Sequence, residues 1–344
     1  MKQPQVLSLG FAVPPQSYTQ NEVFELLGYP RQFRSIFLNA GVSKRHFWIP
    51  LNPYISWQQQ CEEYERGESE MVRQVIRACL DGRDVSDIGC IASAGCCGYA
   101  CPGITHRIAK DMNFSRDVFY TNIWGHGCEG GAPALRRAYD FTKATGKMSL
   151  AISCELCSCA YFPEPPGKPD PTNDYENLRA NAIFGDGASA ALIGYDDDPR
   201  HPYLIDFESY FDPQYIDLLG FVWQDGRLKC RLSRAIPKIA PIVAGPPIKA
   251  ILERNNLTLK DITWWVIHPG GSKVLDNIRD ALGLPEAKMA LSREALYLYG
   301  NCSSSSLGIV GKILMGHEVT PGDWGLVVSL GAGLASGATL LHWG

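Results

Sequence analysis

Short apolar segments alternate with segments of helical period along this chain of 344 residues, and this alternation restricts the fold more than any other feature. The apolar segments are rich in β-branched residues, which predicts buried strands at 88–94, 148–153, 189–194, 263–267 and 325–330. The segments between them predict helices at 69–80, 130–142, 247–255, 272–282 and 304–316. Strands that alternate with helices predict a layered α/β fold.

Two polar interruptions break the pattern. Residues 161–176 contain five prolines with several Asp and Asn, which predicts a long surface excursion. Residues 195–203 contain three aspartates and two prolines, and we place a boundary there between an N-terminal half, 1–195, and a C-terminal half, 196–344. Each half contains a strand that leads through a glycine-rich turn into a helix, which is compatible with an internal duplication.

Charge and apolar patterning exclude several classes of protein. The net charge of −4 provides no basic field for a nucleic acid. There is no run of about 18 apolar residues, and the first residues lack the pattern of a secretion signal, which predicts a cytoplasmic protein without a membrane partner. In that reducing compartment we expect the twelve cysteines to be thiols, most of them small buried apolar residues.

Cys128 is the candidate nucleophile. It follows Gly125 and Gly127 and precedes a helical segment, so we expect it where the N–H groups of a helix end converge. A positive helix end stabilises a thiolate, which predicts a lowered pKa for Cys128. A buried structural cysteine beside a glycine turn would give the same local pattern.

A histidine and an asparagine supply the groups that a nucleophilic thiol needs. His268 ends an apolar strand and is followed by Pro-Gly-Gly, an arrangement that presents a side chain for acid–base work. Asn301 precedes a polar run and a helix, and its amide can donate to an oxygen that becomes negative. Taken alone, His268 is more typical of a hydrogen-bonded core histidine, and Asn301 of a helix N-cap. Together with Cys128 they cover nucleophile, acid–base group and oxyanion donor.

Five motifs give the chain a family resemblance. Cys128 and His268 are 140 residues apart, and His268 and Asn301 are 33 apart. The motifs occur in the order Gly-Cys128-Glu-Gly-Gly, Asn181-Ala-Ile-Phe-Gly-Asp-Gly, Val-Ile-His268-Pro-Gly-Gly, Leu-Tyr-Gly-Asn301-Cys-Ser-Ser and Leu330-Gly-Ala-Gly-Leu. From about residue 85 to 344 the chain resembles the thiolase superfamily, in particular chalcone-synthase-like type III polyketide synthases and stand-alone ketoacyl synthase III enzymes.

The resemblance implies a fold and a reaction. It implies a five-layered αβαβα thiolase fold made of two duplicated halves, assembled as a homodimer. It implies a ketosynthase that performs Claisen condensation: Cys128 accepts an acyl group from a thioester, and a malonyl-derived or β-ketoacyl carbanion then attacks it. His268 and Asn301 would stabilise the enolate. No metal and no organic cofactor are implied.

Departures from the family pattern bear on the acyl pocket. Phe184 matches one aromatic guard of the pocket mouth, whereas Cys230 replaces the other and would widen it. Cys101 falls where a family methionine crosses the dimer interface, and Cys96 and Cys97 would line the nearby wall. Ala332 lies in the glycine-rich run that would border the acyl site, with a backbone N–H aimed at the thioester oxygen. We therefore expect room for a bulky acyl chain.

The sequence is compatible with an acyl group that arrives on coenzyme A and with one that arrives on acyl carrier protein. The stretch where plant-type members hold coenzyme A with lysines matches poorly here. An acidic carrier could dock on four basic residues, although these could equally be solvated charges: Arg31, Arg34, Lys44 and Arg45.

Competing functions follow from the same residues. An acyltransferase of this fold would move the acyl group to oxygen, nitrogen or water without forming a carbon–carbon bond. A silent partner subunit would be expected to lack Cys128.

The Cys154–Cys159 run has no second cysteine pair at zinc-ribbon spacing, so we predict no metal there. Within the same run, Glu155 matches a structural acidic residue of the family.

Overall fold

A computed structural model describes the chain except for residues 1, 52–54, 99, 162–174 and 225–226. In the described part, all five predicted strands are confirmed, with small changes at their ends. The strands are β1 (Gln5–Ala12), β2 (Ser17–Thr19), β3 (Lys44–His46), β4 (Ile88–Ala94), β5 (Phe119–Ile123), β6 (Met148–Glu155), β7 (Gly187–Gly194), β8 (Tyr203–Tyr210), β9 (Leu219–Gln224), β10 (Arg227–Leu232), β11 (Ile262–Ile267), β12 (Trp324–Leu330) and β13 (Ser336–His342).

Helices also occur at each predicted place. Those described are α1 (Gln20–Leu27), α2 (Arg34–Leu38), α3 (Trp57–Leu80), α4 (Ile104–Asp111), α5 (Gly131–Thr145), α6 (Cys157–Tyr161), α7 (Tyr175–Ile183), α8 (Ile236–Arg254), α9 (Ser272–Leu282), α10 (Ala290–Tyr299) and α11 (Ser306–Leu314). The predicted excursion at 161–176 lies almost wholly outside the described residues. Among the described helices, none is long and apolar enough to span a bilayer.

Two helices begin much earlier in the chain than predicted, each for a physical reason. The polar residues of the first half of α3 hide its apolar stripe, but Ser56 and Gln59 form a reciprocal capping box that starts the helix there. Helix α8 contains Pro241, Pro246 and Pro247, which remove backbone donors and normally break a helix. Packing of its buried face against β8, β12 and β13 overrides that local preference.

Strand order reveals a duplicated topology. The large mixed sheet has the order β11-β12-β13-β8-β1-β7-β6-β4-β5. In the N-terminal half, β4 and β6 are parallel, and β7 pairs antiparallel with both β6 and β1. In the C-terminal half, β11 and β12 are parallel, and β13 pairs antiparallel with both β12 and β8. The same four-strand arrangement therefore occurs twice, as the glycine-rich turns indicated only weakly.

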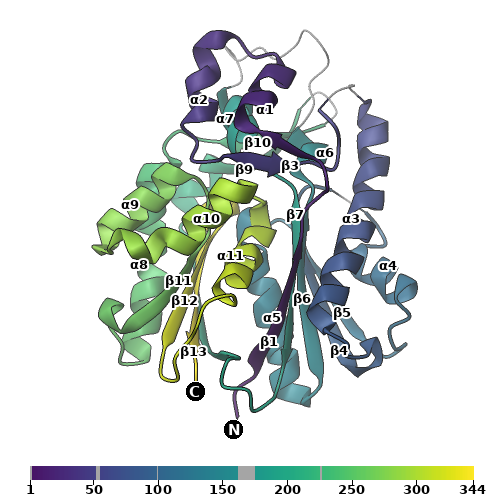
Figure 1. Cartoon of the computed structure of the whole chain (residues 1–344), viewed down its shortest axis with the longest axis vertical. Coiled ribbons are helices and arrows are strands. Elements are labelled where there is room, and N and C mark those ends of the chain that lie inside the picture. Colours follow the sequence, from purple (N-terminus) through teal and green to yellow (C-terminus); the bar gives the residue numbers. More distant parts are fainter. Residues whose placement is uncertain (1, 52–54, 99, 162–174, 225–226) are drawn as a thin grey trace.

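Three apolar clusters separate five layers (Figure 1). One joins α3 to the N-terminal strands, and another joins α8 to the C-terminal strands. The third lies between the two sets of strands and includes the apolar faces of α5 and α11. The order α3, strands, α5 with α11, strands, α8 is the αβαβα thiolase fold that the motifs predicted.

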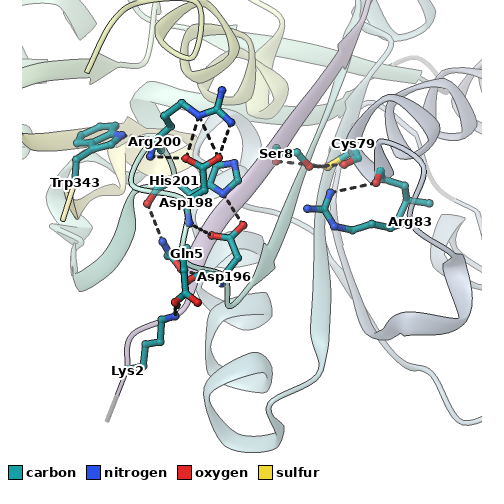
Figure 2. A network of polar contacts seen from close by, with 12 residues as sticks. Lys2, Gln5, Ser8, Cys79, Arg83, Asp196, Asp198, Arg200, His201 and Trp343 are labelled. Atoms are coloured by element: carbon teal, nitrogen blue, oxygen red, sulfur yellow. Dashed lines mark hydrogen bonds and ion pairs between the residues drawn. The ribbon is translucent and has the colours of Figure 1, made fainter. Parts of the chain in front are cut away.

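The connection between the halves is held by polar contacts (Figure 2). The predicted boundary after residue 195 lies in the loop between β7 and β8, and the two halves of the sheet meet there through Gln5 and Tyr203. The Gln5 side chain donates to the carbonyl of His201 at 3.0 Å and accepts from the Asp196 N–H at 3.1 Å. Trp343 Nε1 donates to the Arg200 carbonyl at 3.0 Å. This loop therefore fixes the N-terminal strand and the end of the chain together.

Candidate active site

Cys128 lies in a short 3₁₀ turn, Gly127–Glu129, between β5 and α5. The turn requires glycine, because Gly125 and Gly127 have φ of +86° and +56°. A Cβ on Gly127 would also lie only 3.1 Å from the Cβ of Ala332. Cys128 is 7% exposed, so the thiol is almost fully buried at the start of a central helix.

His268 follows the last residue of β11. Its N–H donates to the Val328 carbonyl of β12 at 2.9 Å, which fixes the backbone against the neighbouring strand. The ring is buried, and its Nδ1 has no hydrogen-bond partner among the described residues. Burial lowers the pKa of His268 to about 4, because the imidazolium loses its hydration. At neutral pH the ring is therefore uncharged and able to accept a proton.

Asn301 is oriented by hydrogen bonds at both backbone and side chain. Its N–H donates to the Ile183 carbonyl at 2.8 Å, and the neighbouring Phe184 forms a backbone bridge with it. The Ser303 N–H donates to Asn301 Oδ1 at 2.9 Å. Because Oδ1 is engaged, the side chain presents its Nδ2 amino group as the donor for a bound oxygen. Ser303 has a φ of +49°, which is unusual for a residue other than glycine.

Ser303 also connects the asparagine loop to the nucleophile. Its Oγ lies 3.4 Å from Cys128 Sγ and donates to it. Ala332, which follows β12, donates its N–H to the His126 carbonyl at 3.0 Å, two residues before Cys128. The loops of Cys128 and Asn301 are therefore in contact through Ser303, and β12, to which His268 is hydrogen-bonded, leads into the segment that contacts the Cys128 loop.

The predicted lowering of the Cys128 pKa is wrong for the resting pocket. Burial raises the pKa of Cys128, and the nearby Cys96 and Glu155 add to the rise. The hydrogen bond from Ser303 opposes it but is the smaller effect. The stabilisation of the thiolate by the helix end is outweighed by the loss of hydration of the buried thiolate. With His268 neutral as well, the resting pair is a thiol and an imidazole.

The other predicted pocket residues are distributed unevenly. Phe184 and Cys230 are buried in the N-terminal core, beside α7 and on β10. Cys101 is exposed. Ala332 touches the nucleophile loop, but its N–H is used by the His126 carbonyl. The prediction that this N–H faces the thioester oxygen is therefore wrong for Ala332.

One of the four predicted docking residues is corrected by the structure. Arg31, Arg34 and Lys44 are exposed, but Arg45 is fully buried. Its Nη1 donates to the carbonyls of Asn181 and Phe184 at 2.7 and 2.8 Å. Arg45 therefore braces the backbone beside Asn301 and cannot meet a carrier protein.

Glu155 organises polar groups that sequence reasoning left unassigned. Its Oε1 accepts from Ser304 Oγ at 2.6 Å and from Ser303 Oγ at 3.3 Å. Its Oε2 accepts from the Cys96 N–H at 3.1 Å. Glu155 thus ties the wall formed by Cys96 to the loop that holds Asn301. The polar run after Asn301 was the available signal, but nothing in the sequence paired it with Glu155.

A cavity of about 690 Å³ lies between the two halves rather than at Cys128. Its inner wall includes Gly131 of α5 and Ser304, and its outer end includes Arg200, His201 and Trp343. None of the three predicted catalytic residues lines it. The cavity backs onto the active-site loops without including the nucleophile.

Family comparisons match both halves of the chain. Residues 56–197 match the N-terminal domain of chalcone and stilbene synthases. Residues 252–343 match the C-terminal domain of 3-oxoacyl-[acyl-carrier-protein] synthase III. These are the two groups that the motifs around Cys128 and Asn301 resemble.

Curated relatives match over nearly the whole length. The chain is 29% identical to a putative chalcone synthase of Bacillus subtilis (strain 168), with 98% of each chain covered. It is 29% identical to a 1,3,6,8-tetrahydroxynaphthalene synthase of Streptomyces peucetius subsp. caesius, covering 98% of this chain and 93% of the relative. It is 26% identical to a 3,5-dihydroxyphenylacetyl-CoA synthase of Streptomyces toyocaensis, covering 99% and 90%.

Solved structures share the fold. The type III polyketide synthase domain of Steely1 from Dictyostelium superposes with a TM-score of 0.88 at 20% identity, with 99% of each chain covered. The tetrahydroxynaphthalene synthase of Streptomyces coelicolor A3(2) superposes with a TM-score of 0.86 at 24% identity, covering 98% and 99%.

Fold and site together define a thiolase-superfamily condensing enzyme. Within that superfamily the chain is similar to chalcone-synthase-like type III polyketide synthases and to stand-alone ketoacyl synthase III enzymes. It is a ketosynthase, an enzyme that joins acyl thioesters by Claisen condensation.

Proposed function

We propose that this enzyme condenses an acyl starter with malonyl-type extenders, both delivered as coenzyme A thioesters, with Cys128, His268 and Asn301 as the catalytic residues. The observation that carries the proposal is the contact of the Cys128 and Asn301 loops at Ser303, whose backbone N–H holds Asn301 Oδ1 and whose hydroxyl contacts Cys128 Sγ. In class terms the enzyme is an acyltransferase, because Cys128 carries the acyl group between two thioesters.

Acylation is the first stage of the proposed reaction. His268, neutral at pH 7, accepts the proton of the Cys128 thiol while the sulfur attacks the thioester carbonyl. The carbon–sulfur bond to coenzyme A breaks, and the leaving thiolate takes the proton back from His268. The acyl group is then bound to Cys128, and the imidazole is again uncharged.

Decarboxylation and condensation form the second stage. A malonyl thioester loses CO₂, and its electron pair becomes an enolate whose oxygen accepts hydrogen bonds from His268 and from Asn301 Nδ2. The enolate carbon attacks the acyl carbonyl, a carbon–carbon bond forms, and the bond to Cys128 sulfur breaks. The thiolate is then reprotonated from solvent. The burial of both donors supports this role, since water competes poorly there.

Coenzyme A delivery is favoured over carrier delivery by two observations. One relative is named a 3,5-dihydroxyphenylacetyl-CoA synthase. The loss of Arg45 from the predicted docking set leaves only Arg31, Arg34 and Lys44. A homodimer, with Cys101 at its interface, and a cytoplasmic location remain predictions, as does the division into 1–195 and 196–344.

A substrate panel tests the proposal. Purified enzyme is incubated with acyl and malonyl thioesters on coenzyme A and, separately, on carrier protein, and products are identified by mass spectrometry. We expect carbon–carbon bond formation from the coenzyme A thioesters and none in Cys128→Ala. Acylation of Cys128 followed only by hydrolysis, or by transfer to oxygen or nitrogen, would instead establish the acyltransferase alternative.

A further inference from the structure

Two cysteines and a glutamate from neighbouring strands lie together beside the nucleophile. Cys96 and Cys97 follow β4, and Glu155 ends the adjacent parallel strand β6. One ligand atom from each lies within 4.8 Å of the other two, and all three residues are buried. We name these three residues the thiol–carboxylate cluster. Two thiols and a carboxylate form a donor set that suits zinc and cadmium ions.

The spacing between the Cys96 and Glu155 donor atoms agrees with tetrahedral coordination. Bonds of about 2.3 Å to sulfur and about 2.0 Å to oxygen place two ligand sulfurs about 3.8 Å apart, and a sulfur and an oxygen about 3.5 Å apart. Cys96 Sγ lies 3.4 and 3.3 Å from the two Glu155 oxygens. Cys97 Sγ lies 3.7 Å from Cys157 Sγ, so a third thiol lies beside the cluster.

Neighbouring groups would support a bound cation. Ser304 Oγ donates to Glu155 Oε1 at 2.6 Å, and the Cys96 N–H donates to Oε2 at 3.1 Å, so the carboxylate is already held in place. A divalent ion with two thiolates and one carboxylate carries a net negative charge. The buried guanidinium of Arg45 interacts electrostatically with Cys157 and would offset that charge.

We propose that the thiol–carboxylate cluster binds one thiophilic divalent cation of the zinc type, with a water molecule completing the tetrahedron. Two metal–sulfur bonds form, with one metal–oxygen bond to Glu155 and one to the water molecule; the S–H bonds of Cys96 and Cys97 break, and both protons pass to solvent. No change of oxidation state is involved. The ion would be an inhibitor and not a cofactor.

Inhibition follows from the contacts of Ser303. This hydroxyl lies 3.3 Å from Glu155 Oε1 and 3.4 Å from Cys128 Sγ, so a cation that engages Glu155 displaces a group in contact with the nucleophile. This consequence rests on the proposed function, because it requires Cys128 to carry the acyl group. Binding of the ion does not rest on it.

The binding experiment uses reduced, metal-free enzyme titrated with Zn²⁺ or Cd²⁺. Native mass spectrometry counts ions and lost protons, and ultraviolet charge-transfer absorbance reports cadmium–thiolate bonds. We expect one ion and two lost protons per chain, both preserved in Cys128→Ala. Cys97→Ser and Cys96→Ser should each weaken binding more than the about tenfold loss expected for the supporting Ser304→Ala. Cys61→Ser, at an exposed thiol of α3, is the matched control and should bind as the wild type does.

The opposite results overturn the proposal. Three results would each exclude the cluster: no bound ion in the wild type, binding as tight as the wild type's in folded Cys97→Ser and Cys96→Ser, or loss of binding only in Cys128→Ala. Circular dichroism verifies that the variants fold. In the activity arm, Zn²⁺ should abolish condensation and a chelator should restore it. Binding without inhibition would support the site and overturn its coupling to Cys128. If condensation is never observed, the proposed function fails, whereas the binding results still decide the metal site.

Discussion

Asn301 offers the sharpest separation of the two stages of the proposed reaction. Asn301→Ala removes the Nδ2 donor, and Asn301→Asp keeps an oxygen for the Ser303 N–H but replaces the donor with a second acceptor. Asn301 is only 2% exposed, so water replaces the donor poorly. A lost oxyanion donor in such a site costs about 3 kcal/mol, which slows decarboxylation about 100-fold. The aspartate should be at least as impaired, because its charge repels the enolate.

The assay follows both stages on the same samples. Acylation is measured as the rate at which an acyl mass appears on Cys128, and decarboxylation as CO₂ release from a malonyl thioester. We expect acylation within about threefold of the wild type in both variants, since Cys128 and His268 remain. Equal losses in acylation and decarboxylation would refute the assigned role, and so would an Asn301→Asp variant that decarboxylates normally.

Three further predictions rest on buried charges. Burial raises the pKa of Glu68 to about 7, so the free energy of unfolding falls as pH rises from about 4.5 to about 7. Glu68→Gln should therefore add about 3 kcal/mol to the free energy of unfolding near pH 8.5 and nothing below about pH 4.5. Equal urea midpoints for both proteins at high pH would contradict this. Arg45→Met should cost about 3 kcal/mol in urea unfolding by leaving two backbone carbonyls without their donor, whereas exposed Arg34→Ala should change little; equal effects would be contrary to a bracing role. Because burial raises the pKa of Cys128, its alkylation rate by iodoacetamide should climb about tenfold per pH unit from about pH 6 to 9, and a plateau near pH 7 would mean that His268 holds a thiolate there.

The fold was largely predictable because its central strands are continuous apolar runs. The strands 88–94 and 263–267 match β4 and β11 closely, since strands buried on both faces read as such. The start of α3 and the prolines of α8 obscured those helices, because a polar surface and proline both mask the helical signal. Pairing between β1 and β7 joins residues far apart in the chain, and no local pattern specifies it.

The candidate catalytic residues could be picked out of the sequence because each lies in a distinctive turn, after β5 for Cys128, after β11 for His268 and after α10 for Asn301. Their environment could not be predicted. Arg45 reads as a surface charge from its neighbours, and only the packing of the chain reveals it beneath Phe184. The pKa of Cys128 likewise depends on desolvation and on Glu155, contributed by another strand. Groups that come from different strands, such as Cys96 with Glu155, carry no sequence signal of their proximity.

Duplication explains how the site is assembled. Helices α5 and α11 occupy equivalent places before the third strand of each half, and both lie in the central layer (Figure 1). The N-terminal copy contains the proposed nucleophile Cys128 at the start of its central helix, and the C-terminal copy contains the proposed partners His268 and Asn301. The proposed active site therefore needs both copies.

The central claim is best tested by a single-turnover chase. Enzyme acylated on Cys128 is freed of excess thioester and then mixed with ¹³C-labelled malonyl-coenzyme A, and protein and product masses are recorded over time. We predict that the acyl mass leaves Cys128 as a labelled product extended by two carbons, and that Cys128→Ala gives neither acyl-enzyme nor product. Release of the unextended acid, with no label incorporated, would contradict the assignment of this site as a carbon–carbon bond-forming centre.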